Sequence, residues 1–483
     1  MTRRLPASLR VLTPTLLAAA LGACVVGPHY SRPATPMTAT FKEADGWAPA
    51  HPSDAADRKD WWTVFGDPVL DDLERRVNIS NQTLAAAEAA YREAHALVQQ
   101  DRAALFPTIS LNGSATAAKT GGSATLSNGG TVATTTGTRT VYQPSVGGSW
   151  APDIWGSVRR TIQNASATAQ ASAATLANAR LSAQTELAVD YIQLRQLDEE
   201  KRLLDATAEA YGRTLEITRN RYAAGVAARS DLLTAQSQLQ SAQANVADLA
   251  QQRARAEHAL AILTGRAPAE VTLPPASWTL TPPAIPAAVP STLLERRPDI
   301  AAAERAAAAA SAQIGVQTAA YFPTLSLTGQ GGYAASQLGQ LFNASSSFWS
   351  VGASVAEAVF DAGARRAKVA QARAAYDQAV ANYRQTVLTA LGQVEDNLAA
   401  QRVLADESAL RSAAADSATA GETIARNEYA AGTVAYTTVV VAQTGALAAR
   451  NSALAIQAQR LTTSVDLIEA LGGGWTRAAL PRN

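Results

Sequence analysis

The sequence predicts a mixed α and β membrane protein that is built from a tandem repeat and closes a barrel only when several chains combine. The first observation is an internal repeat, because FPTISLNG at Phe106–Gly113 returns as FPTLSLTG at Phe322–Gly329. The second is the change of period within each copy, from a helical pattern to strand-like alternation and then to a long proline-free helical pattern. A repeat of this kind supplies the same part twice to one quasi-symmetric assembly.

The N-terminus has the charged and short apolar regions of a secretory signal peptide, which we assign to residues 1–23. The apolar run is too short to cross a membrane as a helix. It ends in LGAC at Cys24, the only cysteine, which resembles a bacterial lipobox and implies lipid on the Cys24 thiol. Residues 24–60 would then be a lipid-anchored extended segment, and the lack of aspartate at Val25 and Val26 favours the outer membrane. A buried cysteine or ordinary cleavage at a small residue is the alternative.

Composition argues against several classes of function. The 41 basic and 40 acidic residues are interspersed and leave a net charge of +1, so nucleic acid is not an expected partner. Hydrophobic residues make up 47% of the chain but aromatic residues only 6%, which suits closely packed helices better than one large globular core. The four histidines lie far apart, and no Ser-His-Asp order, phosphate loop or zinc signature occurs. We therefore expect neither an enzyme nor a metal or cofactor site.

The first repeat, residues 61–266, begins with a helical pattern from Trp61 to Leu105, in which Asp67 can cap a helix that starts at the following proline. A β-hairpin is predicted at about 106–152, because apolar and polar side chains alternate there. A Gly/Ser/Thr-rich stretch at about 114–140 predicts the loop between its two strands.

The second repeat, residues 298–474, has the same order of elements, with a β-hairpin at about 322–360 and a shorter loop at 330–347. A proline-rich linker at 267–297 joins the repeats, and residues 475–483 form a C-terminal tail. The shorter loop explains why the spacing between matching motifs falls from 216 residues before the hairpin to about 206 after it.

Each hairpin leads into a long helical stretch that is followed by a shorter, returning one. A stretch of about 65 residues reaches roughly 100 Å at 1.5 Å per residue, far more than a compact domain needs. Both long stretches end near YAAG, where Gly225 and Gly432 can adopt the left-handed conformation that ends a helix. The long stretches are Ser157–Tyr222 and Ala364–Tyr429, and the returning ones are about Ser230–Leu263 and Tyr436–Leu471.

Two hairpins give four amphipathic strands per chain, each about long enough to cross a bilayer when tilted. Four strands cannot close a barrel, and an open edge is not tolerated in lipid, so closure needs several chains. A dimer would supply eight strands, whose interior is filled by side chains, whereas a trimer supplies twelve and leaves a lumen. With the long helices, the trimer describes a pore with a tubular extension; an ordinary soluble sheet is the alternative.

An ordered set of short motifs in both halves matches a known family. The matching residues are Trp61-Trp62, Phe65–Leu70, Glu295–Ile300, Ala303-Glu304, Ile314-Gly315, Phe322–Thr324, the two YAAG motifs, Ala235-Gln236 and Ala442-Gln443. They span about residues 60–472. The chain resembles the TolC-like outer-membrane factors, and specifically the NodT-type lipoproteins that serve resistance-nodulation-division pumps.

The resemblance implies a homotrimer with a twelve-stranded outer-membrane β-barrel, four strands per chain, continued by a long periplasmic α-helical barrel. Such a trimer is the exit duct of a tripartite efflux pump, and it passively conducts small molecules such as drugs and toxic compounds. An inner-membrane resistance-nodulation-division transporter and a periplasmic adaptor (membrane fusion) protein are the implied partners, together with outer-membrane lipid. An outer-membrane component of type I protein secretion has the same fold and is one alternative. A non-pore periplasmic scaffold lipoprotein is another, although the amphipathic strands argue against it.

The resemblance also implies a gate at the periplasmic tips, where members of the family close. One position departs from the family pattern, because Val441 stands where relatives often have an aspartate that narrows the pore. We therefore hypothesise a gate held more by apolar packing than by charge; plain helix packing and turn geometry are the alternative. The candidate residues are Arg221, Tyr222, Gly225 and Asp231 in the first copy, and Tyr429, Gly432, Tyr436 and Val441 in the second.

Two further motifs have structural interpretations. Arg296–Asp299 (RRPD) suits the start of a helix, because proline fits the first turn and Asp299 complements the helix dipole. Asp153–Gly156 (DIWG) stands at the junction of hairpin and long helix, where Trp155 either anchors at the membrane interface or packs against its neighbours.

Overall fold

The computed structural model describes residues 25–36, 38, 40–43, 60–119, 138–277, 281–283 and 296–481. The predicted signal peptide and Cys24 lie outside the described residues. The chain divides into two compact units that cut across the two sequence repeats, so the repeat boundaries remain a prediction. The first unit comprises the described residues among 1–32, 93–169 and 305–380, and the second those among 33–92, 170–304 and 381–481.

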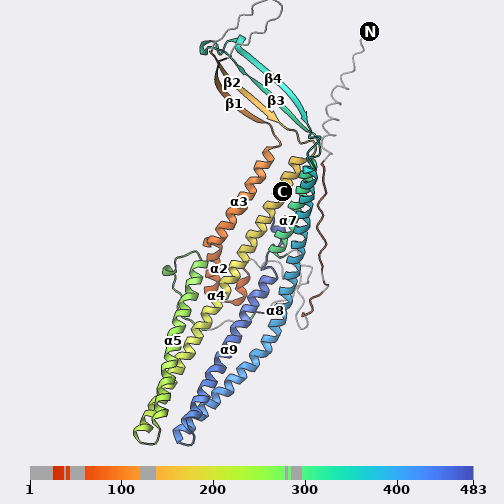
Figure 1. Cartoon of the computed structure of the whole chain (residues 1–483). Helices are drawn as coiled ribbons and strands as arrows, with labels where there is room; N and C mark the ends of the chain where they lie inside the picture. The colour runs from red at the N-terminus through yellow and green to blue at the C-terminus, as the bar shows by residue number, and fades with distance from the viewer. Residues whose placement is uncertain are drawn as a thin grey trace, which may run out of the picture. The chain divides into compact units, whose positions relative to one another are not determined.

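The first unit contains one antiparallel sheet with the strand order β1-β2-β3-β4 (Figure 1). Each predicted hairpin supplies two neighbouring strands, and β2 pairs with β3 to join them. The first loop is shorter than predicted, because residues 114–119 extend β1 and pair with residues 138–143. Small polar residues gave no strand signal there, yet their backbones complete the ladder. The strands are β1 (Thr108–Lys119), β2 (Thr138–Trp150), β3 (Thr324–Tyr333) and β4 (Ser347–Ala356).

The register puts apolar residues on one face of all four strands. Leu111 lies opposite Val146, Val146 opposite Gly331, and Gly331 opposite Trp349, and paired residues share a face. On this face Leu111 and Trp349 are 82% and 80% exposed in the single chain. The opposite face is polar, with Thr108, Ser110, Asn112, Ser145, Ser149, Thr328, Gln330 and Ser350.

The predicted helix from Trp61 to Leu105 is three elements: the 3-10 helix η2 (Trp61–Phe65), α2 (Pro68–Ser80) and α3 (Gln82–Ala103). Asp67 caps α2, because its Oδ1 accepts hydrogen bonds from the backbone N–H groups of Val69 and Leu70 at 2.8 and 3.2 Å. The unpredicted break falls at Asn81. Its Oδ1 accepts from Leu84 N and its Nδ2 donates to Leu263 O, so Asn81 caps α3 and ties it to another helix.

The long helices have the lengths that the sequence predicts, 67 residues for α4 and 68 for α8. In the second unit, α4 with α5 and α8 with α9 form two helical hairpins that turn at the same end (Figure 1). The bounds are α4 (Ser157–Ala223), α5 (Arg229–Leu263), α7 (Pro298–Ala319), α8 (Ala364–Ala431) and α9 (Tyr436–Ala470). The 3-10 turns are η3 (Pro268–Glu270), η5 (Leu338–Gln340), η6 (Ala344–Ser346) and η7 (Arg477–Ala479).

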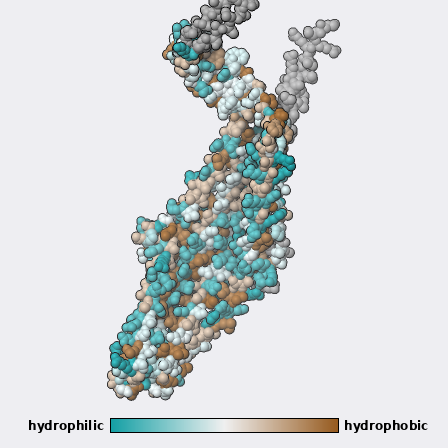
Figure 2. Space-filling model, viewed as in Figure 1, coloured by the Kyte–Doolittle hydropathy of each residue, from teal (hydrophilic) through white to brown (hydrophobic). Residues whose placement is uncertain are grey.

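The core of the second unit lies away from the turns, where Trp62 of η2, Tyr191 of α4 and Tyr383 of α8 are at most 1% exposed. The Tyr191 hydroxyl donates to Asp67 Oδ2 at 2.6 Å, which ties α4 to the cap of α2. Among the described helices, α9 alone is long and apolar enough to cross a membrane by length and composition. Its C-terminal half instead packs into this core through Leu461, and Figure 2 shows hydrophilic residues interspersed over the helices.

Candidate gate at the helical tips

The two helical hairpins of the second unit end in turns built on the YAAG motifs. Gly225 and Gly432 have φ values of 74° and 82°, the left-handed conformation that side chains other than glycine rarely adopt. Their N–H groups donate to the carbonyls of Tyr222 and Tyr429 at 2.9 and 3.0 Å, which closes the last helical turn. The glycine conformation and a hydrogen bond within the motif therefore fix each turn, and the YAAG motif predicts both.

Arg221, near the end of α4, holds the end of α8. Its Nη1 donates to the Tyr429 carbonyl at 2.6 Å, and its guanidinium carbon lies 4.7 Å from the centre of the Tyr429 ring. The Tyr429 hydroxyl lies 3.3 Å from Thr218 Oγ1, so α4 contacts both the backbone carbonyl and the hydroxyl of this tyrosine. A charged hydrogen bond and a cation-π contact on one tyrosine couple the two hairpins within the chain.

A small apolar cluster lies next to this contact and joins both hairpins. The rings of Tyr429 and Tyr436 lie 5.3 Å apart, and each residue is 3% exposed. Burial, assisted by nearby phenol and carboxyl groups, raises the pKa of Tyr436 to about 12, so its phenol stays neutral at physiological pH. We call Ala235, Tyr429, Tyr436 and Val439 the tip cluster.

The remaining sequence-predicted residues do not join the tip cluster. Tyr222 and Val441 are 42% and 72% exposed. Asp231 is half-buried in the first turn of α5, where its charge complements the helix dipole. Of the valine run, Val439 is buried inside the chain, whereas Val441 faces outward. Apolar packing in the tip cluster and the charged contacts of Arg221 together hold the two hairpins of one chain, and Val441 lies on the surface of that chain.

Sequence reasoning missed three polar residues beneath the tip cluster. Thr214 and Thr218 of α4 are 1% and 0% exposed, and each hydroxyl donates to the carbonyl four residues earlier. Gln443 of α9 is 2% exposed and donates to Thr214 Oγ1 at 3.4 Å. The four-residue spacing of the threonines places them on one helix face, which is the signal that could have found them.

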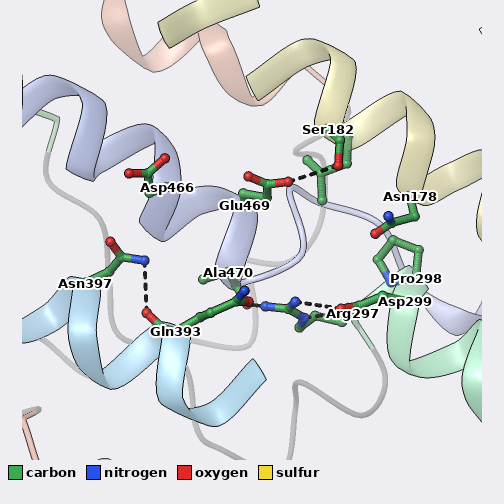
Figure 3. A pocket seen from close by; sticks show the side chains of 11 residues that line it. Asn178, Ser182, Arg297, Pro298, Asp299, Gln393, Asn397, Asp466, Glu469 and Ala470 are labelled. Atoms are coloured by element: carbon green, nitrogen blue, oxygen red, sulfur yellow. Dashed lines mark hydrogen bonds and ion pairs between the residues drawn. The ribbon is translucent and has the colours of Figure 1, made fainter. Parts of the chain in front are cut away.

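A polar pocket of about 410 Å³ lies in the second unit between α4, α7, α8 and α9 (Figure 3). Arg297 pairs with Asp299 at 2.6 Å and donates from Nη1 to the Ala470 carbonyl at 3.0 Å. Glu469 accepts a hydrogen bond from the Ser182 hydroxyl at 3.1 Å. The Arg297 contact joins the start of α7 to the end of α9, which agrees with the helix-start interpretation of the RRPD motif, and the Glu469 contact joins α9 to α4.

A sheet with one exposed apolar face and two edges that no other described strand pairs with, together with two long helical hairpins, defines a subunit of a TolC-like outer-membrane channel. Channels of this class are transport proteins. The chain belongs to the outer membrane efflux protein family, whose model matches residues 75–266 and 289–473. It is the outer-membrane channel of an efflux system, the exit duct that the resemblance implied.

Known proteins of similar sequence and structure agree. The solvent efflux pump outer membrane protein SrpC of Pseudomonas putida is 30% identical over 94% of this chain and 96% of its own length. The solved outer-membrane channel OprN is 30% identical, with a TM-score of 0.81 over 94% of this chain and all of that chain. The Campylobacter jejuni CmeC channel has a TM-score of 0.87 over 94% of this chain and 96% of that chain; at 24% identity, this likeness concerns the fold.

Proposed function

We propose that three copies of this chain form the exit duct of a tripartite efflux pump. Their sheets make a twelve-stranded barrel in the outer membrane, and their helices make the periplasmic α-barrel. The observation that carries the proposal is the exposed apolar face of a sheet whose edge strands β1 and β4 have no further partner among the described strands. Lipid tolerates no open sheet edge, so β4 of one copy pairs with β1 of the next.

We infer three copies by comparing the interior of a barrel closed by two copies with that of a barrel closed by three. Two copies give eight strands, whose interior side chains fill the barrel, whereas three copies give twelve and leave an aqueous lumen. The polar face of the sheet suits a wet lumen, since Thr108 and Ser149 hydroxyls lie 2.9 Å apart and Asn112 donates to Ser110 Oγ at 3.1 Å. The apolar face then contacts lipid.

Membership of the family supports a proposal for partners and cargo. The duct has no energy source of its own, so a periplasmic adaptor protein connects it to an inner-membrane transporter of the resistance-nodulation-division type. The relative SrpC is named as a solvent efflux pump protein, which supports small molecules over secreted proteins as the cargo of this chain. The lipobox sequence supports a lipid anchor on Cys24, which keeps the N-terminus at the outer membrane.

Conductance in planar bilayers tests the duct directly. The purified protein is expected to give discrete conductance steps, and a variant that lacks Thr108–Trp150 is expected to give none, because two strands per copy are then missing. Deletion of residues 121–136 is the matched control, since it leaves β1 and β2 complete and should keep the conductance. A purified trimer that gives no steps, or the same steps from both deletions, would overturn the pore.

For the periplasmic gate, we propose that apolar surfaces of neighbouring copies meet at the tips. Val441 supports this, because it is 72% exposed and borders a groove of about 620 Å³ between α8 and α9. The groove is lined mainly by small residues, which let helices approach closely. Its lining residues are Ala418, Gly421, Glu422, Ala425, Thr437, Thr438, Val441, Ala442, Gly445 and Ala446.

Val441→Asp is expected to raise the conductance of the closed state in single-channel recordings. Three carboxylates that meet at the tips repel one another and lose the apolar contact, so the closed arrangement becomes less stable. Gln457→Asp, at an exposed position further along α9, is the control and should leave the closed state unchanged. An unchanged closed-state conductance in Val441→Asp would rule out the proposal that apolar contacts at Val441 hold the gate closed.

A further inference from the structure

The segment that follows Cys24 makes an unusually close backbone contact in the first unit. Gly27 has φ 96°, and a Cβ built on it would lie 2.4 Å from the Cα of Gly315 in α7. Real Cβ atoms do not approach another backbone so closely, so residue 27 has to be glycine for both its conformation and its packing. Helix α7 therefore fixes where this extended segment lies.

Arg160 of α4 holds the same two residues through their carbonyl groups. Its Nε donates to Val26 O and its Nη2 to Gly27 O, both at 3.1 Å, and the residue is 4% exposed. Its Nη1 donates to Gln163 Oε1 at 2.9 Å, so all three guanidinium nitrogens have an acceptor. A Cβ at Gly315 would lie 2.8 Å from the Arg160 side chain, so this second glycine leaves the room that Arg160 occupies.

Trp155 connects this contact to the end of the sheet. The Val26 N–H donates to the Trp155 carbonyl at 3.1 Å, and the Trp155 indole N–H donates to the Pro323 carbonyl at 2.7 Å. Its ring stacks on Phe322 at 4.7 Å. Pro323 immediately precedes β3. Trp155 therefore links Val26 to the residue before the first residue of β3. We call Gly27, Trp155, Arg160 and Gly315 the clasp.

We propose that the clasp positions the lipid anchor at the helix end of the barrel strands; this inference rests on the proposed lipidation of Cys24. Chain geometry sets the scale, because three residues from Gly27 reach at most about 10 Å. Further along the segment, Tyr30 also contacts the unit, because its ring lies 5.7 Å from the Arg305 guanidinium carbon. If the clasp is lost and Tyr30 remains as the fixed point, six residues separate the lipid from it, and the reach doubles to about 20 Å.

The expected consequence concerns insertion of the barrel. A short tether keeps the acyl chains beside the strands that have to enter the same membrane, and doubling its length lowers the effective concentration about threefold. The clasp residues are thus positioning residues, which act through the lipid and touch no transported molecule. Val25 also packs closely against this part of the unit, since a Cβ at Gly156 would lie 2.8 Å from Val25 Cγ1.

A double-mutant cycle tests the clasp, using wild type, Gly27→Val, Cys24→Ser and the double variant. The readout is the fraction of the chain found as heat-resistant trimer in outer-membrane fractions. We expect Gly27→Val to lower this fraction about threefold in the lipidated chain, and to lower it no further in the Cys24→Ser chain. An equal loss in both backgrounds would make the contact merely structural and overturn the proposal, as would no loss in the lipidated chain.

Two controls separate the clasp from lipidation itself. Mass spectrometry of the N-terminal peptide reports the lipid on Cys24, so a wild-type peptide without lipid refutes the anchor and not the contact geometry. Arg160→Gln removes both carbonyl hydrogen bonds from a position far from the processing site and should reproduce the loss seen with Gly27→Val. His29→Ala, at an exposed neighbouring position, should match wild type. A loss with His29→Ala equal to that with Arg160→Gln would count against the clasp.

Discussion

Replacing Val351 with arginine is expected to remove most of the assembled channel from the outer membrane, whereas arginine at the adjacent Ser350 leaves assembly intact. Val351 lies near the middle of β4, is 80% exposed in the single chain and shares a face of the sheet with Ile109. In the proposed barrel this face contacts acyl chains, where an arginine at the bilayer midplane costs about 2–4 kcal/mol per copy. The proposed trimer carries three copies, so the cost is incurred three times.

Ser350 is the matched control because it differs from Val351 only in the face that it occupies. It lies opposite Gln330 on the polar face, so in the barrel an arginine there points into the wet lumen and stays hydrated. Unheated gel electrophoresis of outer-membrane fractions compares the trimer that each variant forms. Equal trimer levels from the two variants, or a larger loss from Ser350→Arg, would contradict the assignment of the lipid and lumen faces.

The strand faces, the long helices and the glycine turns were predictable because each has a local signal. Ile109 and Leu111 alternate with polar residues, and this period of two by itself assigns a face. Gly225 and Gly432 stand at the ends of long proline-free patterns, where a left-handed residue is expected. Such features depend on residues only a few positions apart, so a short stretch of sequence is enough to predict them.

Contacts between distant segments had no such signal. Arg221 and the Tyr429 carbonyl lie 208 positions apart in sequence, and nothing near either residue specifies the other. The same holds for Gly27 on Gly315 and for the pairing of β2 with β3 across the two repeats. Resemblance to a family brought Arg221 and Tyr429 onto one list of candidates, but only the structure selects which of them touch.

The break at Asn81 and the buried threonine Thr218 escaped notice for a different reason. Asparagine and threonine occur in ordinary helices, and their role depends on whether the side chain finds a backbone group outside its own turn. Asn81 reaches Leu263 O at 2.8 Å, and Thr218 lies beside Tyr429. Helix propensity is therefore correct for these residue types on average, but it does not contain the contacts that their side chains make with distant segments.

Glu74 on α2 is a buried carboxyl that no described residue pairs with, and it carries the largest stability effect that we expect in the helical part. The residue is 0% exposed, and neither carboxyl oxygen has a hydrogen-bond partner among the residues that the structure describes. Burial raises the pKa of Glu74 from 4.5 to about 9, and the nearby charge of Asp71 adds to the shift. Glu74 is therefore protonated at pH 7 in the folded chain and ionised in the unfolded chain.

The sign of the pH dependence follows from these two pKa values. Below pH 4.5 both states hold the proton, so Glu74 causes no pH-dependent loss. Between pH 4.5 and about 9 the folded chain holds a proton that the unfolded chain has released, so the free energy of unfolding falls as pH rises. The loss is about 1.4 kcal/mol per pH unit, or roughly 3 kcal/mol by pH 7.

Glu74→Leu is therefore expected to raise the free energy of unfolding by roughly 3 kcal/mol at pH 7 and to remove the part of its decline between pH 5 and pH 9 that Glu74 causes. Thermal unfolding, followed by the helical circular dichroism of the detergent-solubilised protein at pH 5, 7 and 9, measures both effects. Glu74→Gln separates them, because it removes the titration but keeps an unpaired buried amide, so its profile should be flat with a smaller gain.

Asp72→Asn is the surface control on the same helix. Its side chain is half exposed and pairs with Arg76 at 2.6 Å, and such a pair is worth at most about 1 kcal/mol. A wild-type profile as flat as that of Glu74→Leu would mean that the Glu74 carboxyl is ionised in the folded protein. It would then have to meet a cation or hydrogen-bond donor from outside the described residues, either in the rest of its own chain or in a neighbouring copy.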